Sequence, residues 1–396
     1  MQTGEWISAD QFKNLFINDV PLMDVRANIE FVENHFPSSV NLPILDNEQR
    51  AQVGTAYKQQ GRDSAMALGY QLVSGPDQQQ KLQVWESFLR QNPAAVITCF
   101  RGGLRSKITQ SWLQEMKNIF RPRIEGGTKA LRQYLLQNLE QMTSDTKPLP
   151  WQLVTGPTGS GKTLLLQSLQ SLQSKVHVLD LEKMANHRGS AFGFYPTPQP
   201  AQAVFENQIS VNLLKWTLHE KPIAIEDESR LIGRCVLPDK LFAALRKQPV
   251  ILIQESLEFR IKNTYEEYVL QSLMQNRSVQ AIYSDFQLAL KKIEQRLGNQ
   301  RYQEIAKDLL LAQQKMQDYE LSQSGHLLAG HSLAEHSLMG TSGFLVNEGY
   351  EVNSVWIQKL LTSYYDPMYT YSLKKRNPEV RFQGTWAECQ QFMSNK

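Results

Sequence analysis

The sequence GPTGSGKT at residues 156–163 decides the fold of the larger part of this chain. It stands between a strand-like stretch, WQLVT (151–155), and a helix-like one, LLLQSLQSL (164–172). In this order of strand, glycine-rich loop and helix, the glycines let successive backbone N–H groups converge on an anion at a helix N-terminus. The motif therefore predicts a phosphate site. A chance match is the alternative, and the flanking strand and helix argue against it.

Each residue type in this loop has a separate task. Lys162 adds a positive charge, and the hydroxyl of Thr163 can hold a magnesium ion. ATP, GTP and a lipid diphosphate present the same terminal groups, so the loop by itself leaves these three ligands open. The residues expected to bind the diphosphate group are Gly156, Gly159, Ser160, Gly161, Lys162 and Thr163.

Acidic residues close two of the apolar runs that follow, VHVLD (176–180) and IAIED (223–227). Carboxylates at strand ends often complete a phosphate site, either as metal ligands or by positioning water. The alternative is that each acidic group pairs with a nearby arginine, for which Arg188, Arg230 and Arg234 are available. The expected acidic partners are Asp180, Glu226 and Asp227.

The order of apolar runs predicts an α/β protein. The runs at 176–180, 223–227 and 250–254 alternate with helix-length segments, as in a parallel sheet covered by helices. From about residue 284 apolar residues recur at helical spacing and no further strand is evident. The predicted parts are an N-terminal α/β domain (1–141), a linker (142–150), a P-loop α/β domain (151–283) and a helical C-terminal region (284–396).

Composition narrows the class of protein. Of the 396 residues, 41% are apolar and 20% charged, and the formal net charge is +3, which excludes a disordered or fibrous chain. No apolar run reaches about 18 residues and no secretory signal opens the sequence, so we expect a cytoplasmic protein with no membrane partner. Three scattered cysteines, together with His326, His331 and His336 at a spacing unsuited to one helix face, predict neither a disulfide scaffold nor a metal site.

Cys99 ends a further strand-like run, AAVITC (94–99), and is followed by the loop FRGGLRS and a helix-like stretch. A thiolate here would lie beside backbone N–H groups, a helix N-terminus, Arg101 and Arg105, all of which favour the charged form. We therefore expect Cys99 to be a nucleophile. The alternative, a buried structural cysteine, suits Cys235 and Cys389 better.

The residues around this loop resemble a rhodanese domain. The stretches Asp24-Val25-Arg26 and HFPSSVNLP (35–43) look like its first half, and the cysteine loop looks like its active-site loop. Five residues separate Cys99 from Arg105, as in Cys-x5-Arg phosphatases, so the loop has room for a larger atom or a tetrahedral anion. A phosphatase would also need an acid for its leaving group, and the loop offers none.

Taken as a whole, the chain resembles the tRNA 2-selenouridine synthases, a family in which a rhodanese-like domain precedes a P-loop domain. The resemblance spans almost the whole chain. The matching strings are NLPILDNEQRAQVGTAYKQQG (41–61), CFRGGLRS (99–106), GGTKALR (126–132), GPTGSGKT (156–163), DLEKMANHRGSAFG (180–193), IEDESRLIG (225–233) and YYDPMYTY (364–371).

This resemblance implies a transferase that acts in two steps on the wobble 2-thiouridine of tRNA. Geranyl diphosphate first alkylates the sulfur, and selenium from selenophosphate then replaces the geranylated sulfur. Cys99 would carry the selenium as a selenenyl sulfide, and the P-loop would hold the diphosphate. Geranyl diphosphate and selenophosphate are then co-substrates, no tightly bound cofactor is expected, and Mg²⁺ is a further candidate ligand. The residues implied for selenophosphate are Arg101, Gly102, Gly103 and Arg105.

Two stretches suit contact with tRNA. Residues 101–132 hold eight Lys and Arg against Glu115 and Glu125, and more basic residues follow the aromatic-rich segment 364–371. Aromatic and basic side chains together suit an unpaired anticodon base, although the tyrosines could instead pack the C-terminal helices. The candidate tRNA contacts are Lys129, Arg132, Tyr365, Tyr369, Lys374 and Arg376.

Two other functions remain open at this level. One is a P-loop phosphotransferase or ATPase whose rhodanese-like domain is regulatory, which predicts steady nucleotide hydrolysis that does not depend on Cys99. The other is a non-catalytic anion sensor, which predicts that Cys99→Ala leaves function intact. An activated thiol argues against the sensor, because simple binding has no use for one.

Overall fold

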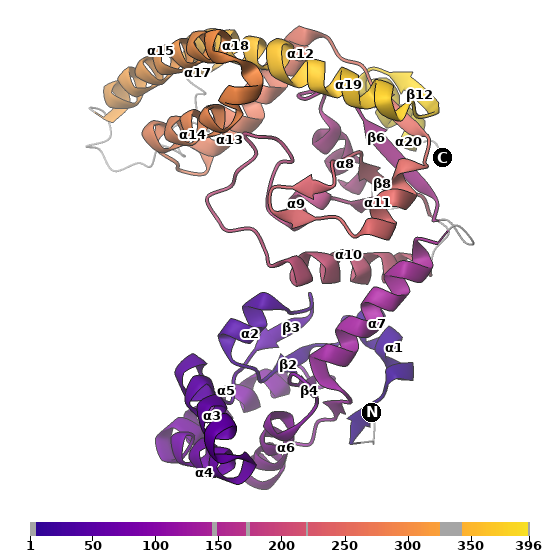
Figure 1. Ribbon diagram of the computed structural model, residues 1–396, viewed down its shortest axis with the longest axis vertical. Helices are drawn as coiled ribbons and strands as arrows, with labels where there is room; N and C mark the ends of the chain where they lie inside the picture. Colours follow the sequence, from indigo (N-terminus) through magenta and orange to yellow (C-terminus); the bar gives the residue numbers. More distant parts are fainter. Residues whose placement is uncertain (1–4, 145–148, 172–174, 219–220, 325–342, 395–396) are drawn as a thin grey trace. The chain divides into compact units, whose positions relative to one another are not determined.

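The structure is a computed structural model that describes residues 5–144, 149–171, 175–218, 221–324 and 343–394. It divides into two compact units (Figure 1). The first unit comprises residues 1–149, 199–220 and 235–241, and the second comprises 150–198, 221–234 and 242–396. Part of the predicted linker, residues 145–148, lies outside the described residues, as do His326, His331 and His336.

A five-stranded parallel sheet forms the centre of the first unit, in the order β1-β5-β4-β2-β3. Because all its pairs are parallel, the carboxyl ends of the strands lie at one edge, and the loop after β4 begins there with Cys99. The strands are β1 (Trp6–Ile7), β2 (Leu22–Asp24), β3 (Ser39–Asn41), β4 (Val96–Thr98) and β5 (Arg123–Ile124).

Helices flank this sheet in the first unit. They are η1 (Ala9–Gln11), α1 (Phe12–Ile17), α2 (Asn28–Glu33), α3 (Asn47–Gln60), α4 (Arg62–Leu72), α5 (Gly75–Gln91), α6 (Leu104–Lys117), α7 (Gly127–Met142) and α10 (Gln202–Trp216). The short strand β10 (Cys235–Val236) and the start of α11 (Asp239–Arg246) also belong to this unit.

Helices α3 and α4 lie side by side and are separated by a single glycine (Figure 1). Asp46 begins α3, because its carboxylate accepts a hydrogen bond from the N–H of Gln49 at 2.8 Å. Gly61, whose φ is +86°, ends α3 and starts α4. Each helix buries only one residue, Ala56 in α3 and Ala65 in α4, so this pair contributes little to the core of the unit.

The position of helix α10 differs from the prediction of a contiguous P-loop domain at 151–283. Segment 199–220, which contains it, belongs to the first unit. There the amide of Asn207 donates hydrogen bonds to Asn34 Oδ1 at 2.9 Å and to the carbonyl of His35 at 2.8 Å. Sequence periodicity identifies such a helix but carries no information about which sheet it packs against.

The second unit is built on another five-stranded parallel sheet, in the order β12-β11-β6-β8-β7. The predicted strands at 151–155, 176–180, 223–227 and 250–254 are confirmed in this sheet. Its strands are β6 (Trp151–Thr155), β7 (His177–Leu179), β8 (Ile223–Glu226), β11 (Val250–Ile253) and β12 (Val380–Gly384), and the short strand β9 (Leu231–Ile232) lies outside it.

Strand β12 corrects the prediction that the region from 284 onward holds no strand. It pairs in parallel with β11 at the edge of the sheet, with Phe382 opposite Ile251. The sequence of β12, VRFQG, has no buried residue. An edge strand of this kind lacks the apolar run by which the inner strands are recognised.

The rest of the second unit is largely helical, as predicted for its C-terminal region. The C-terminal helices share a hydrophobic core that includes Tyr283 and Trp356. The buried Asn353 lies beside both residues: its Oδ1 accepts hydrogen bonds from the hydroxyl of Tyr283 (2.7 Å) and the indole N–H of Trp356 (2.8 Å). None of the helices in the described part of the chain is both long and apolar enough to cross a membrane. The helices are α8 (Lys162–Ser171), α9 (Leu181–Ala185), α12 (Leu257–Tyr265), η2 (Glu266–Leu270), α13 (Gln271–Met274), α14 (Val279–Leu297), α15 (Asn299–Ser324), α17 (Gly343–Val346), α18 (Glu348–Leu360), η4 (Leu361–Tyr365), α19 (Asp366–Arg376) and α20 (Trp386–Ser394).

Removing the buried carboxylate of Asp24 should destabilise the first unit. Asp24 and Arg26 are 0% and 1% exposed, with Arg26 Nη2 2.5 Å from Asp24 Oδ2. Asp24→Ala leaves a buried guanidinium without its counter-charge, so we expect its free energy of unfolding to fall by about 3–5 kcal/mol in urea denaturation followed by circular dichroism.

Glu140→Ala is the matched control. Glu140 pairs with Lys240 on the surface, where the side chains are 59% and 62% exposed, so its loss should cost less than about 1 kcal/mol. If both variants lost the same free energy of unfolding, burial would not make the Asp24–Arg26 pair more important for stability than a surface ion pair.

Candidate functional site: a phosphate loop and a cysteine loop

The loop at 156–161 joins the end of β6 to the start of α8 in the second unit. Gly159 and Gly161 both have a φ of +82°, in the left-handed region that favours glycine. A Cβ atom at Gly156 would lie 2.6 Å from Ser160 Oγ. Backbone conformation or close packing therefore requires glycine at all three positions.

Four carbonyl oxygens of this loop accept hydrogen bonds from side chains. A carbonyl that faces such a donor does not face an anion in the loop, which leaves the backbone N–H groups for that task. The donors are Lys162 Nζ to Gly156 O (3.1 Å), Arg260 Nε to Thr158 O (2.8 Å), Asn263 Nδ2 to Gly159 O (3.1 Å) and Trp386 Nε1 to Gly161 O (3.1 Å).

Ser160 is completely buried in this loop, and its Oγ has no hydrogen-bond partner among the described residues. A buried hydroxyl without a partner is costly, and a phosphate oxygen in the loop would supply one. Thr163, at the start of α8, donates from Oγ1 to Glu182 Oε2 at 3.2 Å. The loop thus offers both an unsatisfied anion contact and a link to an acidic group.

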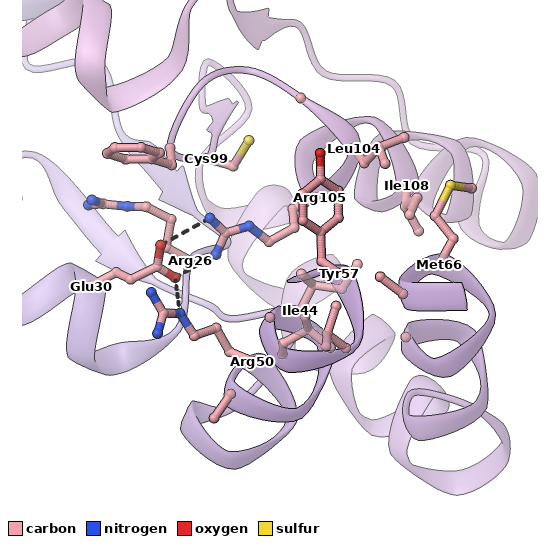
Figure 2. A pocket seen from close by; sticks show the side chains of 18 of the residues that line it. Arg26, Glu30, Ile44, Arg50, Tyr57, Met66, Cys99, Leu104, Arg105 and Ile108 are labelled. Carbon is pink, nitrogen blue, oxygen red and sulfur yellow. Dashed lines mark hydrogen bonds and ion pairs between the residues drawn. The ribbon is translucent and has the colours of Figure 1, made fainter. Parts of the chain in front are cut away.

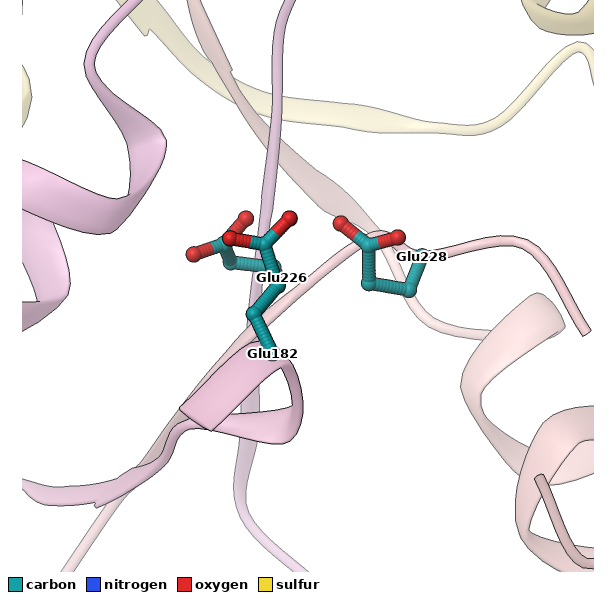
Figure 3. A group of neighbouring side chains, drawn as sticks. All are labelled: Glu182, Glu226 and Glu228. Atoms are coloured by element: carbon teal, nitrogen blue, oxygen red, sulfur yellow. The ribbon is translucent and has the colours of Figure 1, made fainter. Parts of the chain in front are cut away.

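Figure 3 shows that acidic group: the carboxylates of Glu182, Glu226 and Glu228 gather together. One oxygen from each lies within 4.8 Å of the others. Burial, reinforced by the charge of Glu228, raises the pKa of Glu226 to about 8, although Lys162 opposes the rise. Burial and the charge of Glu226 also raise the pKa of Glu182 well above its ordinary value.

These three carboxylates fit a divalent cation. Carboxylate and hydroxyl oxygens are the ligands that Mg²⁺ prefers, and a cation here would offset the burial and the mutual repulsion that raise the pKa values of Glu182 and Glu226. Glu182, Glu226 and Glu228, with the hydroxyl of Thr163, are the residues that would hold it. The sequence predicts Thr163 as a possible ligand of Mg²⁺ and offers carboxylates at two strand ends as metal ligands, without selecting this set of three.

Of the three predicted acidic partners, only Glu226 belongs to this cluster. Asp180 begins α9 instead, accepting a hydrogen bond from the N–H of Lys183 at 2.9 Å. Asp227 forms ion pairs with Arg376 at 2.6 Å and Arg246 at 3.2 Å. Asp227 therefore follows the alternative of pairing with arginine, but with arginines other than those considered.

The stretch HRGS (187–190), in which only Arg188 was expected to have a role, as a possible partner of the acidic groups, lies against the cluster through Gly189. Gly189 has a φ of +60°, and a Cβ there would lie 2.6 Å from Glu182 Oε1 and 2.7 Å from Glu228 Oε2. The buried Arg188 next to it has Nε 3.5 Å from a carboxylate oxygen of Glu267. The adjacent Arg188 and Gly189, a few residues after an acidic strand end, were the signal available in the sequence.

In the first unit, Cys99 follows β4 and is 3% exposed. The N-terminus of α7 packs against its loop: the N–H of Thr128 donates to the carbonyl of Cys99 at 2.9 Å, and that of Lys129 to the carbonyl of Phe100 at 3.1 Å. Gly127, with a φ of +61°, allows this approach, because a Cβ there would lie 2.1 Å from the carbonyl oxygen of Cys99. As in the phosphate loop, neighbouring donors engage the carbonyls.

Arg105 forms a bidentate ion pair with Glu30, at 2.5 and 3.0 Å (Figure 2). Although burial acts in the opposite direction, this ion pair raises the pKa of Arg105, and Arg105 lowers the pKa of Glu30 despite the burial of that carboxyl. An anion beside Cys99 would compete with Glu30 for Arg105. Arg101 and Gly103 are exposed and Gly102 is buried.

Ser106 is a site residue that sequence reasoning missed. It is completely buried, and its Oγ lies 3.3 Å from Cys99 Sγ while donating to the carbonyl of Gly103 at 3.1 Å. In this arrangement the Cys99 thiol donates to Ser106 Oγ; once the thiol is ionised, the hydroxyl can stabilise the thiolate by turning its own proton from the Gly103 carbonyl to the sulfur. Its position directly after Arg105 in the Cys-x5-Arg spacing was the signal.

Four of the candidate tRNA contacts differ in their accessibility. Exposed side chains can meet a macromolecule, so Lys129 and Lys374, both exposed, satisfy that condition. Tyr369 is half-buried, and Tyr365 is buried in the helical core. Tyr365 therefore packs the C-terminal helices, which was the alternative to a tRNA contact.

The other two candidates already have acidic partners. Arg132 forms an ion pair with Glu206 on α10. Arg376 is paired with Asp227, and its side chain is only 9% exposed. Both guanidinium groups have a structural role in the protein without tRNA.

Together, the parallel sheet, the glycine loop after β6 and the carboxylates opposite Thr163 define the second unit as a P-loop domain. A family model described as the tRNA 2-selenouridine synthase AAA domain matches residues 149–334 and 340–396. The tRNA 2-selenouridine synthase of Bdellovibrio bacteriovorus is 40% identical, with 98% of each chain covered. That of Nitrosomonas europaea is 38% identical, with 96% of each covered, and that of Marinobacter nauticus is 39% identical, covering 95% of this chain and 94% of its own. The chain belongs to the tRNA 2-selenouridine synthase family.

Glu226→Gln should change stability in opposite directions with and without a divalent cation. The folded pKa of Glu226 lies near 8, above its ordinary value of 4.5, so the parent loses stability as the pH rises between these values. At about pH 9 with a chelator, the variant should melt several degrees above the parent. With Mg²⁺ present, the parent should gain more than the variant.

Melting curves at several pH values, with chelator and with Mg²⁺, measure this effect. Glu258→Gln, which changes an exposed carboxylate of α12, should move neither curve. If Glu226→Gln melted below the parent at high pH without metal, the claim that the Glu226 carboxylate destabilises the folded protein there would be wrong.

Proposed function

We propose that this protein converts the wobble 2-thiouridine of tRNA to 2-selenouridine by S-geranylation followed by selenium transfer from selenophosphate. Family membership supports tRNA as the substrate and selenium as the element transferred. The observation that carries the two-step scheme is the presence in one chain of two anion loops whose carbonyls are engaged by neighbouring donors. Each loop suits one of the two anionic co-substrates.

In the first step, the sulfur of 2-thiouridine attacks the terminal CH₂ carbon of geranyl diphosphate. The C–S bond forms as the C–O bond breaks, and diphosphate leaves with the electron pair. The backbone N–H groups of the phosphate loop, with Ser160 and Lys162, would stabilise the charge that develops on the leaving group. A cation held by Thr163 and the three glutamates would, when bound, neutralise part of that charge.

In the second step, a selenium nucleophile adds to C2 of the pyrimidine ring and geranylthiol leaves. Thiouridine sulfur is a poor leaving group, and alkylation makes it a better one. The reaction therefore has to follow geranylation.

The release of selenium from selenophosphate favours one role for Cys99 over another. Forming a selenenyl sulfide directly from selenophosphate would require two electrons to pass to phosphorus. Attack by the Cys99 thiolate on phosphorus instead is redox-neutral: the S–P bond forms, the P–Se bond breaks, and selenide leaves with the electron pair. Water then hydrolyses the S–P bond to give phosphate. We favour this route because the Cys-x5-Arg spacing and Ser106 Oγ, 3.3 Å from Cys99 Sγ, suit attack on a tetrahedral phosphorus.

The residues proposed for selenophosphate binding surround this thiol. Gly102 has a φ of +66°, and a Cβ there would lie 2.6 Å from the carbonyl oxygen of Ile124, so the loop requires glycine. The amides of Gly102 and Gly103, with Arg101 and Arg105, would bind the anion. Exposed basic residues such as Lys129 and Lys374 would contact tRNA phosphates, in the cytoplasm where tRNA is modified.

The deciding experiment is mass analysis of nucleosides from 2-thiouridine tRNA incubated with the protein, geranyl diphosphate and selenophosphate. We expect 2-selenouridine from the wild type, S-geranyl-2-thiouridine from Cys99→Ala, and an at least ~100-fold loss of both products from Lys162→Ala. The controls Cys235→Ala and Lys291→Ala should behave as wild type. Untouched thiouridine with wild type, together with steady nucleotide hydrolysis, would favour the alternative of a P-loop phosphotransferase or ATPase with a regulatory rhodanese-like domain.

Ser106→Ala should slow only the second step, by about 10-fold, because it removes the hydroxyl beside the Cys99 thiolate. The time course of S-geranyl-2-thiouridine and 2-selenouridine measures this: the first should accumulate and then decay slowly. Ser106→Thr, which keeps the hydroxyl, should restore part of the rate. Slowing of geranylation itself would argue that the substitution perturbs the whole fold.

A further inference from the structure

Beside Cys99, the first unit contains a cavity of about 1180 Å³ (Figure 2). Pockets for small molecules usually measure about 300–1,000 Å³. Selenophosphate, a single tetrahedral anion, would occupy only a small part of this space. The cavity therefore has room for a second and much larger group next to the thiol.

The two sides of the cavity differ in chemistry. Figure 2 shows Arg26, Glu30, Arg50 and Arg105 on one side, where Glu30 forms ion pairs with Arg50 and with Arg105. The other side is lined by apolar side chains. The apolar residues labelled there are Ile44, Met66, Leu104 and Ile108.

Helices α3 and α4 supply much of the apolar wall with side chains that are not buried in the core of the unit. Each buries only a single alanine. Larger apolar residues of these helices line the cavity, among them Tyr57, Met66 and Tyr70, of which the two tyrosines are 60% and 46% exposed. Apolar area left outside the core in this way points to a ligand that buries it.

Gly54, in the middle of α3, keeps the wall open. A Cβ atom added there would meet nothing within 4 Å, and its φ does not require glycine. Glycine is a poor residue for the interior of a helix. A larger side chain at this position would extend into empty space that the cavity lining surrounds.

We propose that the apolar side of this cavity binds the geranyl chain of the S-geranylated nucleoside during selenium transfer. The inference rests on the proposed function. The C10 chain would lie against the walls from α3, α4 and α6, which places its sulfur, and hence C2 of the base, next to Cys99. The exposed Arg50, Lys58 and Arg62 at the same cavity would face the tRNA phosphates. The cavity would thus select the alkylated nucleoside, and geranylthiol would leave from it.

Binding of anticodon stem-loops that carry S-geranyl- or S-methyl-2-thiouridine to a Cys99→Ala protein tests this assignment without turnover. We expect the geranyl stem-loop to bind at least ~10-fold more tightly than the methyl one. Met66→Asp and Gly54→Trp should reduce this preference to within about 2-fold while leaving the methyl stem-loop unaffected. Ala67→Asp, an exposed neighbour on α4, and Gly54→Ala should retain the preference.

The outcomes separate the pocket from the reaction. If the Cys99→Ala protein prefers the geranyl stem-loop and both cavity variants keep that preference with normal circular dichroism, the geranyl chain binds elsewhere and the assignment fails. If otherwise wild-type protein supplied with geranylated tRNA and selenophosphate makes no 2-selenouridine, the proposed function fails first. Loss of the preference in Met66→Asp and Gly54→Trp alone supports the cavity.

Discussion

An anion-binding loop works only if its carbonyl oxygens are turned away from the anion, because a carbonyl and an anion repel each other. Both loops of this protein meet that requirement with donors from other elements. In the cysteine loop, the first N–H groups of α7, which have no partner within their own helix, bind the carbonyls of Cys99 and Phe100. In the phosphate loop, side chains from α12 and α20 do so, together with Lys162. Segments far along the chain therefore determine the shape of each loop, and α20 is needed although it follows the loop by more than two hundred residues.

The two sites carry excess charge of opposite sign: negative beside the phosphate loop and positive beside the cysteine loop. The phosphate loop faces three carboxylates that repel one another, those of Glu182 and Glu226 buried and that of Glu228 half-buried, and a bound cation would resolve the repulsion. The cysteine loop has arginines, and Glu30 partly neutralises Arg105 before any anion arrives. A cation would stabilise the acidic site, while Glu30 already supplies the basic site with a negative charge.

Local sequence carries the parts of the fold that depend on neighbouring residues. The strand before GPTGSGKT, the helix after it and the strand ending at Cys99 are all present, because apolar runs and glycines act over a few positions. Local sequence could not show which acidic residues lie beside the phosphate loop, because that depends on contacts between distant parts of the chain. Asp180, Glu182, Glu226, Asp227 and Glu228 look alike in sequence, and only the three-dimensional structure shows that α9 uses Asp180 as its N-cap and that two arginines pair with Asp227. The edge strand β12 was missed for a similar reason, since an exposed strand that lies beside β11 leaves no apolar run.

Helix α10 has a consequence for how such a protein could have arisen and how it can be divided. The chain leaves the P-loop domain after residue 198, adds α10 to the first unit, and later returns to that unit for residues 235–241. A gene cut after residue 149 would encode a first unit that lacks α10, and the remainder would carry an apolar helix whose packing partners are gone. A cut that keeps each unit intact would therefore have to leave residues 199–220 and 235–241 with the first unit, which no single cut in the chain can do.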